Sequence, residues 1–404
     1  MAVMSGETSL DVAYWMRPGT LQLSALPPLS LYVHLPWCIK KCPYCDFNSH
    51  AWDAQQGGGL PEQAYVQALL SDLELSLPLI WGRPIHSIFM GGGTPSLFEP
   101  HFIGELISGI RSRLPLVPDC EITLEANPGT FEKDRFKAFG QAGVNRLSLG
   151  VQSFNDAHLK ALGRVHSSDQ AQAAAHEASE TFARWNLDLM YALPGQTRDD
   201  LQADLAVVAQ LKPPHVSIYQ LTIEPNTQFA KFPPKHLPDE DASYDMLDDI
   251  MAFAHTQGLQ RYEVSAFAKA AQRCWHNTNY WQFGDYLGIG AGAHSKISFA
   301  HRVVRQVRWR EPALYLSHAA TQPVAQAHEV KRDELPFEFM LNALRLVEGF
   351  PLAWFSERTG LPLSALEPGL EQALAKQWLV LEEGVLRPSA QGMDFLSEVQ
   401  QLFL

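Results

Sequence analysis

The sequence predicts an α/β fold in which a parallel sheet is followed by a smaller and mainly helical region. Two observations carry this prediction. Short β-rich runs alternate with segments of helical apolar spacing, and the alternation gives way to a less regular pattern after the sixth run. Six strand–helix units in series form either an open doubly wound sheet or a partial barrel. In both architectures ligands bind at the carboxyl ends of the strands.

Each expected strand is a short β-rich run, and a helix-length segment separates it from the next. The expected strands are Leu29–Leu35, His86–Met90, Glu121–Asn127, Arg146–Gln152, Asn186–Leu193 and His215–Thr222. The expected helices are Pro61–Leu77, Glu99–Leu114, Thr130–Gly143, Ser167–Phe182 and Arg198–Leu211. A helix between successive strands implies right-handed crossovers, and therefore parallel strand pairing.

The rest of the chain is expected to be less regular and finally helical. The expected elements are a helix at Asp241–Gly258, a strand at Arg261–Phe267, helices at Phe337–Val347 and Ser364–Lys376, and a hairpin at Leu379–Arg387. The last of these resemble a winged helix, but residues 335–404 contain only four basic residues against nine acidic ones. A helix that reads a DNA groove needs more cations, so we expect an interaction or covering domain.

Composition restricts the class of protein. The chain has 404 residues, 46% of them apolar and 19% charged, and a net charge of −13, so no nucleic-acid partner is expected. No apolar run reaches the ~18 residues of a membrane helix. The first sixteen residues also lack the Lys or Arg of a signal peptide. Five cysteines are an odd and sparse set, which argues against disulfides and favours a cytoplasmic location.

The expected domains follow from these patterns. Residues 1–28 are expected to be a loosely ordered lead, residues 29–300 the strand–helix body with its extension, and residues 301–404 the C-terminal domain.

The strongest chemical motif is Cys38-Ile-Lys-Lys-Cys42-Pro-Tyr-Cys45, directly after the first expected strand. A zinc knuckle would need a further cysteine at position 55, where the chain has Gln55. Covalent haem attachment would need a histidine at position 46, where the chain has Asp46. The remaining interpretation is a [4Fe–4S] cluster held by three thiolates, with a fourth iron open to an exogenous ligand.

This cysteine loop resembles that of the radical S-adenosylmethionine (SAM) superfamily, and the motifs around it resemble its coproporphyrinogen oxidase-like branch. The motifs are Leu31–Cys38, Tyr44, Gly91–Pro95, Glu125 in Leu-Glu-Ala-Asn-Pro, Gly150–Phe154, Arg164 and Asp188, and the similarity runs from about Pro28 to the C-terminus. The resemblance implies a partial (β/α)6 radical-SAM-type barrel with a winged-helix-like C-terminal domain. It also implies a cluster whose open iron binds SAM.

The residues themselves agree with a ligand site at the strand ends. Glu125, Gln152 and Asp188 each lie in or at the end of an apolar strand, and such polar residues on successive strands are expected to line one site. The resemblance implies a cofactor site formed by Tyr32, Tyr44, Gly92, Gly93, Thr94, Glu125, Gln152, Arg164 and Asp188. Arg164 suits this role, because a guanidinium pairs bidentately with a carboxylate.

A second stretch, Cys274–Phe283, places a histidine among large aromatic residues. Imidazole is an axial ligand of haem iron, and aromatic rings offer an apolar wall to a porphyrin face. The run His276-Asn-x-x-Tyr280-Trp281 also resembles a motif of the haem chaperones in this branch. We therefore expect His276 to bind haem, with Tyr280 and Trp281 in the pocket wall. Cys274 is a further candidate ligand.

Two functions from different classes are consistent with the resemblance. One is an oxygen-independent coproporphyrinogen III oxidase, and the other is a chaperone that passes haem to an acceptor protein. The oxidases have a fourth cysteine two positions beyond the third, where this chain has Phe47, and a longer arm than the 31 residues before Tyr32. These departures and the motif at His276 favour the haem chaperone without oxidase activity. Cleavage of SAM during haem transfer stays open.

Overall fold

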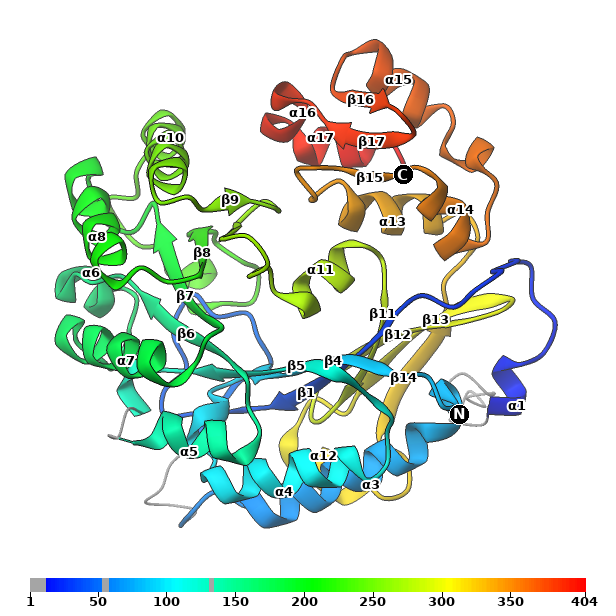
Figure 1. Cartoon of the computed structure of the whole chain (residues 1–404), viewed down its shortest axis with the longest axis horizontal. Coiled ribbons are helices and arrows are strands. Elements are labelled where there is room, and N and C mark those ends of the chain that lie inside the picture. Colours follow the sequence, from blue (N-terminus) through cyan, green and yellow to red (C-terminus); the bar gives the residue numbers. More distant parts are fainter. Residues whose placement is uncertain (1–11, 53–57, 131–133) are drawn as a thin grey trace.

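The computed structural model describes residues 12–52, 58–130 and 134–404. Within these ranges the scaffold is a series of parallel strands: β1 (Leu29–Leu35), β4 (Ile85–Gly92), β5 (Leu116–Ala126), β6 (Arg146–Gln152), β7 (Trp185–Tyr191) and β8 (His215–Gln220). Neighbours pair in this order, and every one of these pairings is parallel. The strands form an open arc rather than a flat sheet (Figure 1), which confirms the partial barrel.

Helices on the convex side of the arc connect these strands (Figure 1). They are α3 (Glu62–Ile80), α4 (Pro100–Arg111), α5 (Arg135–Ala142), α6 (Asp156–Ala161), α7 (Ser168–Thr181) and α8 (Arg198–Leu211). Capping boxes at Ser167 and Thr197 satisfy free backbone N–H groups at the starts of α7 and α8. The buried face of α7 consists of small residues, among them Ala171, Ala174 and Ala178, so this helix can lie close to the sheet.

Further strands extend the arc at both ends. Beyond β1 lie β11 (Asp285–Ile289), β12 (His294–Phe299), β13 (Arg302–Arg308) and β14 (Val324–Glu329), and beyond β8 lie β10 (Ala266–Ala268) and β9 (Gln260–Arg261). In the described part of the chain, one sheet of 12 strands runs in the order β14-β13-β12-β11-β1-β4-β5-β6-β7-β8-β10-β9. β11 is parallel to β1, whereas the pairings farther out are antiparallel.

The structure differs from two expectations in this region. Residues 261–267 are not one strand, because the chain turns back after β9 and pairs Phe267 with Arg261. The expected domain boundary between residues 300 and 301 falls in the turn of the β12–β13 hairpin, where Phe299 pairs with Arg302. β13 and β14 therefore belong to the barrel sheet, and the C-terminal domain begins after β14.

A buried ion pair fixes the extension to the first crossover helix. The Arg308 guanidinium of β13 donates to Asp72 of α3, with 3.1 Å between Nη2 and Oδ1, and both side chains are fully buried. The hydroxyl of Tyr315, in α12 (Pro312–His318), donates to the same carboxylate at 2.9 Å. Because an unpaired charge is costly in the interior, this network holds α3, β13 and α12 together.

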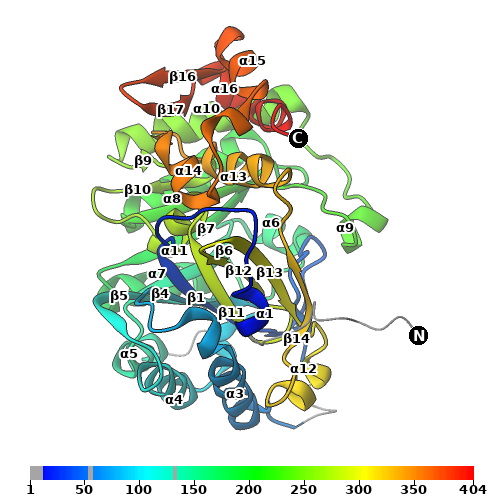
Figure 2. The same ribbon diagram turned by 90° about the vertical axis from the view of Figure 1, so that its right-hand side faces the viewer.

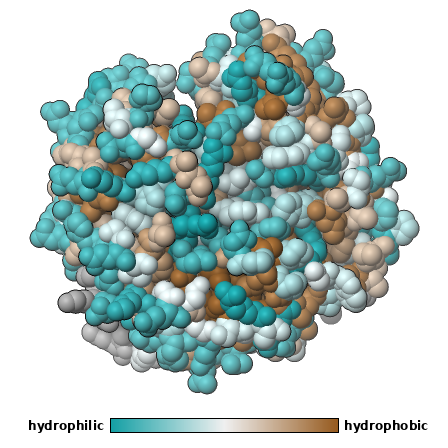
Figure 3. Space-filling view, in the orientation of Figure 1, coloured by the Kyte–Doolittle hydropathy of each residue, from teal (hydrophilic) through white to brown (hydrophobic). Residues whose placement is uncertain are grey.

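The C-terminal domain lies at the open side of the arc and has its own hydrophobic core around Phe339, Phe350 and Phe355 (Figure 1). In the space-filling view a notch separates it from the part of the molecule that carries α10 (Glu240–Thr256) (Figure 3). The elements of the C-terminal domain are α13 (Leu335–Ala343), β15 (Phe350–Pro351), α14 (Ala353–Thr359), η3 (Leu363–Leu366), α15 (Gly369–Ala375), β16 (Leu379–Glu382), β17 (Val385–Pro388), α16 (Ala390–Asp394) and α17 (Leu396–Gln401). The expected hairpin is β16–β17. The helix expected at 364–376 is interrupted, because Pro368 has no amide hydrogen to continue the helical ladder.

The N-terminal lead differs from the expected loose order. Residues 1–11 lie outside the described residues, but 12–28 begin with α1 (Val12–Trp15) and pack against the body. Trp15, Leu21 and Leu23 are buried, and the amides of Leu21 and Leu23 donate to the turn before β13. Figure 2 shows this dark blue segment running from α1 to β1 beneath α13 and α14. Apolar side chains at positions 15, 21 and 23 thus tie the lead to the fold.

Among the residues described, none of the helices combines the length and the apolar character needed to cross a membrane.

Candidate functional site

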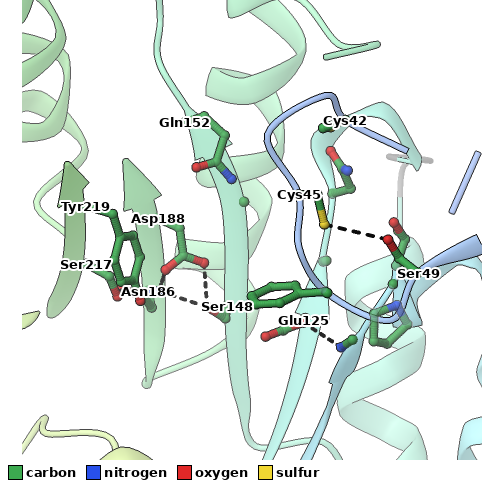
Figure 4. Close-up of a pocket in the computed structure, with 18 of the residues that line it drawn as sticks. Cys42, Cys45, Ser49, Glu125, Ser148, Gln152, Asn186, Asp188, Ser217 and Tyr219 are labelled. Carbon is green, nitrogen blue, oxygen red and sulfur yellow. Dashed lines mark hydrogen bonds between the residues drawn. The ribbon is translucent and has the colours of Figure 1, made fainter. Parts of the chain in front are cut away.

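A cavity of about 500 Å³ opens at the carboxyl ends of the parallel strands. The cysteine loop forms one side, and β5 to β8 contribute polar side chains to the other (Figure 4). Most of the residues expected to bind a cofactor line it, namely Cys38, Cys42, Tyr44, Cys45, Gly92, Gly93, Thr94, Glu125, Gln152, Arg164, Asp188 and His276. Tyr32, Tyr280 and Trp281 do not. The structure thus places the cysteine motif and the strand-end residues in one site.

Two short strands close the base of the cysteine loop. β2 (Trp37–Cys38) pairs with β3 (His50–Ala51), so residues 39–49 project as a loop over the cavity. The side-chain amide of Asn48 donates to the carbonyls of Ala291 and Arg310, which anchors the loop to the β11 side of the sheet. Pro43 and the turn bond from the Cys45 amide to the Cys42 carbonyl shape the segment that carries the thiols.

Each cysteine sulfur lies close to at least one polar side chain. The Thr94 hydroxyl donates to Cys38 Sγ at 3.5 Å, and Arg164 Nη1 lies 3.6 Å from Cys42 Sγ. Ser49 Oγ lies 3.6 Å from Cys45 Sγ (Figure 4). Hydrogen bonds to thiolate sulfur stabilise its negative charge and set the potential of an iron–sulfur cluster.

The donor set fits a cluster with three thiolate ligands. In the part of the chain that the structure describes, no three His, Cys, Asp or Glu side chains could hold one metal ion. Burial raises the pKa of the Cys38 and Cys45 thiols, so a ligated metal would be needed to keep them as thiolates. The three half-buried sulfurs are therefore suited to a metal cluster, which is larger than a single ion, rather than to one ion.

The glycine run after β4 allows close packing of the chain. Gly92 has φ +113°, and a Cβ there would meet the His34 ring at 2.3 Å. A Cβ on Gly93 would lie 2.5 Å from the Trp37 carbonyl oxygen. Only glycine leaves room for these neighbours. The backbone amide of Gly92 donates a hydrogen bond to Glu125 Oε2 at 3.1 Å. The run thus positions both the cysteine loop and a carboxylate of the site.

Two acidic residues, Glu125 and Asp188, line the cavity. Burial, together with the nearby Asp188, raises the pKa of Glu125 to about 8. Burial also raises the pKa of Asp188, although Asn186 and Ser148 donate hydrogen bonds to it at 2.7 and 2.9 Å. Figure 4 shows Glu125 and Asp188 on either side of the strand that carries Ser148 and Gln152. A ligand with positive charge would stabilise both of their ionised forms.

Arg164 and Gln152 also line the cavity. Arg164 Nη2 donates to Asn127 Oδ1 and to the Gly150 carbonyl, both at 2.6 Å, which fixes the guanidinium beside Cys42. Gln152 has φ +71° at the end of β6, and its side chain points toward the cavity (Figure 4). This left-handed backbone is unusual for glutamine and is a feature found at functional sites.

Three cavity-lining residues carry buried polar atoms that lack hydrogen-bond partners among the described residues. They are Thr123 Oγ1, Arg164 Nε and His276 Nδ1. Buried polar groups are otherwise paired in folded proteins, so their grouping around one cavity indicates a bound ligand. Arg164 Nε can donate to an anionic group beside the cysteine loop.

The two tyrosines of the expected cofactor site have different surroundings. Tyr44 lines the cavity and packs against Phe229, with 6.4 Å between ring centroids. Tyr32 lies behind the cavity wall, where its hydroxyl is 2.9 Å from His34 Nδ1 and its ring stacks near Phe89. In this structure Tyr32 therefore supports the wall rather than facing a ligand.

The histidine of the aromatic stretch lies on α11 (Trp275–Trp281), inside the arc of strands. The His276 ring stacks on Phe89, with centroids 4.6 Å apart, and burial lowers its pKa to about 4. The imidazole is therefore neutral at physiological pH, the form that binds a metal. Cys274 also lines the cavity, but burial raises its pKa to about 12 and its thiol points to Glu121 at 3.6 Å.

Tyr280 and Trp281, which are expected to form the haem wall, lie outside this cavity. α11 runs out of the cavity, so its last turn packs against β11 and the C-terminal domain. The Tyr280 ring lies 5.1 Å from Tyr286, and Arg345 of the segment after α13 lies 4.2 Å above the Trp281 ring. One helical turn separates them from His276, which is enough to move them from the cavity to a domain contact.

The sequence analysis missed an inward row of polar residues on the strands. Ser148, Asn186, His215, Ser217 and Tyr219 line the cavity and form a network around Asp188 (Figure 4). The sequence does contain a pattern that indicates this row. Each of these residues lies two positions from another polar residue, and alternate residues of a strand share one face.

The sequence analysis also missed a buried ion pair beneath α11. Arg146 Nη1 lies 3.2 Å from Glu121 Oε2, and Glu121 Oε1 accepts the Trp275 amide at 2.8 Å. This pair anchors the start of α11, and no local pattern connects residues so far apart in the sequence.

The fold and the cysteine loop together define a radical SAM protein. The family model described as the Radical SAM superfamily matches residues 32–208, and that of the HemN C-terminal domain matches residues 330–395. Among solved structures, the coproporphyrinogen III oxidase HemN of Escherichia coli is similar, with a TM-score of 0.79 and 25% sequence identity. The match covers 94% of this chain and 90% of that chain.

Curated relatives define the family more closely. The haem chaperone HemW of Escherichia coli is 46% identical over 381 residues, which are 94% of this chain and 99% of that protein. HemW of Haemophilus influenzae is 45% identical, covering 94% and 98%, and HemW of Bacillus subtilis is 33% identical, covering 93% and 99%. The chain belongs to the HemW family of haem chaperones, which confirms the branch and the function class expected from the sequence.

Proposed function

We propose that this chain binds haem and passes it to an acceptor protein, with a [4Fe–4S] cluster and SAM in its barrel cavity. The observation that carries the proposal is the convergence of three half-buried cysteines, two carboxylates and one neutral histidine on a single cavity. The haem part is supported by relatives that are named haem chaperones and are 33% to 46% identical.

Cys38, Cys42 and Cys45 are the residues that would hold the cluster. A cluster with three protein thiolates supplies an iron atom with an open position, to which SAM binds in this superfamily. Arg164 is placed beside Cys42 with its Nε atom available to the carboxylate of SAM. Glu125 and Asp188 face the same space and would stabilise the positive charges of SAM.

His276 is the proposed axial ligand or essential contact of haem. Its Nδ1 atom is unpaired and its ring is neutral, so the imidazole needs no proton loss before it binds iron. Phe89 stacks on it from β4 and limits the positions that its ring can adopt. The aromatic surface beside the ligand is thus Phe89 rather than Tyr280 and Trp281.

The proposed function also includes a partner protein and a location in the cell. The acceptor is a protein that binds haem, and the cytoplasm expected from the sparse cysteines stays a prediction. Phe47 lines the cavity at the position where the oxidases have a fourth cysteine, which favours a carrier without oxidase activity.

The test is anaerobic purification, reconstitution with iron and sulfide, and titration with haem, followed by an assay with coproporphyrinogen III. The proposal predicts iron–sulfur absorption, a saturable Soret band and no turnover. Turnover above that of a cluster-free control would assign the chain to the oxidases. A reconstituted protein without a saturable Soret band would not be a haem carrier.

A further inference from the structure

Exposed apolar side chains gather around the cysteine loop. Ile39 and Phe47 of the loop are 48% and 59% exposed, Val165 is 48% exposed, and Phe232, just after α9 (Gln228–Lys231), is 69% exposed. Large apolar residues are normally exposed singly, so a group of them beside a cavity opening indicates an interaction surface.

These residues come from three segments that contact one another. Ile39, Lys40 and Val165 line one shallow depression beside the loop. The Phe229 amide of α9 donates to the Pro43 carbonyl at 3.0 Å, which holds α9 against the loop. Figure 2 shows α9 projecting from the body of the molecule. We call the exposed side chains of Ile39, Lys40, Lys41, Phe47, Val165, Lys231, Phe232 and Lys235 the loop–α9 surface.

The loop–α9 surface is basic, although the chain as a whole is acidic. Lys40, Lys41, Lys231 and Lys235 are exposed, and they are four of the twelve lysines in a chain of net charge −13. Among the described residues none of the four forms an ion pair. The Lys41 Nζ atom donates instead to the Phe47 carbonyl, and Lys231 Nζ lies 5.4 Å from the Phe232 ring.

The loop–α9 surface borders the opening of the cavity. Of its four lysines, Lys40 lines the cavity, together with the acidic residues Asp46 and Glu224. Lys40 and Phe47 line the cavity as well as the outer surface. Whatever binds the loop–α9 surface therefore covers the route by which a ligand leaves the cavity.

We propose that the loop–α9 surface docks the acceptor protein, through an acidic surface with apolar contacts around the acceptor's haem pocket. This rests on the proposed function. Apolar anchors with a charged rim are the usual composition of a protein–protein interface, and opposite charge speeds the encounter. A symmetric second copy is disfavoured, because an isologous contact would place these lysines against themselves.

The experiment compares haem transfer to two probes, an acidic acceptor, apo-cytochrome b5, and the less acidic apomyoglobin. The donor is the haem-loaded full chain carrying Lys231→Glu and Lys235→Glu, or Phe232→Ser. The matched control carries Lys137→Glu and Lys212→Glu, since Lys137 and Lys212 are also exposed but lie on α5 and after α8.

The proposal predicts that the α9 charge reversal slows transfer to the acidic acceptor about five- to tenfold at low ionic strength. The difference should largely disappear at about 0.5 M salt, where the screening length is only about 4 Å. Phe232→Ser should slow transfer at both salt concentrations. The control and the transfer to apomyoglobin should change about twofold or less.

Several results would overturn the proposal. If the control variant slowed haem transfer equally, the rate would depend on the net charge of the chain and not on this surface. Weaker haem loading with unchanged transfer would make the surface part of the haem site, and loss of a dimer in sedimentation would make it a contact between copies. Failure of the unsubstituted chain to load haem would contradict the proposed function itself, and with it the docking of a haem acceptor at this surface.

Discussion

The His276 ring stacks on Phe89 of β4, with 4.6 Å between the ring centroids, at the inner wall of the cavity that the cysteine loop covers. Five residues later, Trp281 lies under the Arg345 guanidinium of the C-terminal domain. The seven-residue helix α11 therefore joins the candidate haem ligand to a domain contact. The motif His-Asn-x-x-Tyr-Trp combines two cavity residues, His276 and Asn277, with two residues that fix the helix.

Replacing His276 and replacing Trp281 should have different effects. His276→Ala should shift the Soret band and weaken haem binding about tenfold or more, because an axial ligand is lost, while the iron–sulfur absorption stays. Trp281→Leu should leave the Soret maximum in place but lower the free energy of unfolding by about 1–3 kcal/mol. Haem titration and urea unfolding measure the two effects. An unchanged haem spectrum and affinity in His276→Ala would exclude it as a ligand.

Each of the cluster cysteines should be essential for iron–sulfur absorption. Cys38→Ser, Cys42→Ser and Cys45→Ser should each lose the broad absorption after anaerobic reconstitution, since only three thiolates are available. Cys120→Ala is the matched control, because Cys120 is buried in β5 away from the cavity. Iron and sulfide analysis gives the stoichiometry. Zinc in place of iron and sulfide in freshly isolated protein would contradict the account.

SAM binding should depend on pH through Glu125. Its pKa of about 8 means that it is mainly protonated at neutral pH in the free protein. A cationic ligand favours the carboxylate, so the dissociation constant should fall as pH rises from about 6 to 8, by up to about tenfold per unit. Glu125→Gln should weaken binding and remove this part of the dependence. Calorimetry on reconstituted protein tests it, and an equal pH slope in both proteins would assign the proton to another group.

Glu125 should also make the stability of the fold depend on pH. Stability should fall over the pH range in which SAM binding becomes stronger. The folded pKa of Glu125 lies above its ordinary value of 4.5, so the folded protein binds the extra proton between these two values. Stability without ligands should therefore fall as pH rises from about 4.5 to 8, and Glu125→Gln should flatten that slope. Urea unfolding of the cluster-free protein at several pH values measures it. A steeper slope in the variant would show that the sign is wrong.

Loss of the buried ion pair between Asp72 and Arg308 should lower the free energy of unfolding more than loss of an exposed ion pair. Asp72→Ala leaves a buried guanidinium without its carboxylate and should cost about 3–5 kcal/mol of unfolding free energy. Asp72→Ala with Arg308→Met should recover part of this loss. Asp249→Ala removes a carboxylate from the half-exposed Arg198 and should cost about 1 kcal/mol or less. Similar losses for Asp72 and Asp249 would mean that the buried pair does not hold the extension to α3.

The parallel strands could be predicted because their pattern is local. β1 and β6 begin and end where the β-rich runs of the sequence begin and end. β11 to β14 could not be predicted in this way, since several of their residues are charged. Lys296 and Arg308 are buried there only because Asp285 and Asp72 pair with them, and the partner of Arg308 lies 236 positions away in the chain.

The part of the candidate site that could be predicted consists of residues whose position follows from the ends of the strands. Cys38, Glu125 and Gln152 lie at or just after strand ends, so their meeting at one edge of the sheet follows from the topology, and Asp188 faces the same cavity from the middle of β7. The direction of α11 depends instead on the packing of Trp281 against the C-terminal domain, which no local pattern contains. For that reason His276 lies in the cavity and Tyr280 lies outside it.

The measurement that tests the central claim most directly is haem transfer from the loaded chain to an apo acceptor. The reconstituted chain is saturated with haem, freed of excess haem, mixed with a haem-free acceptor protein, and separated from it again. The account predicts that the Soret absorption leaves the chain and appears on the acceptor, with little transfer from His276→Ala because it loads poorly. Haem that stays on the chain, or a rate equal to that of haem released into solution, would contradict the claim that this protein is a haem carrier.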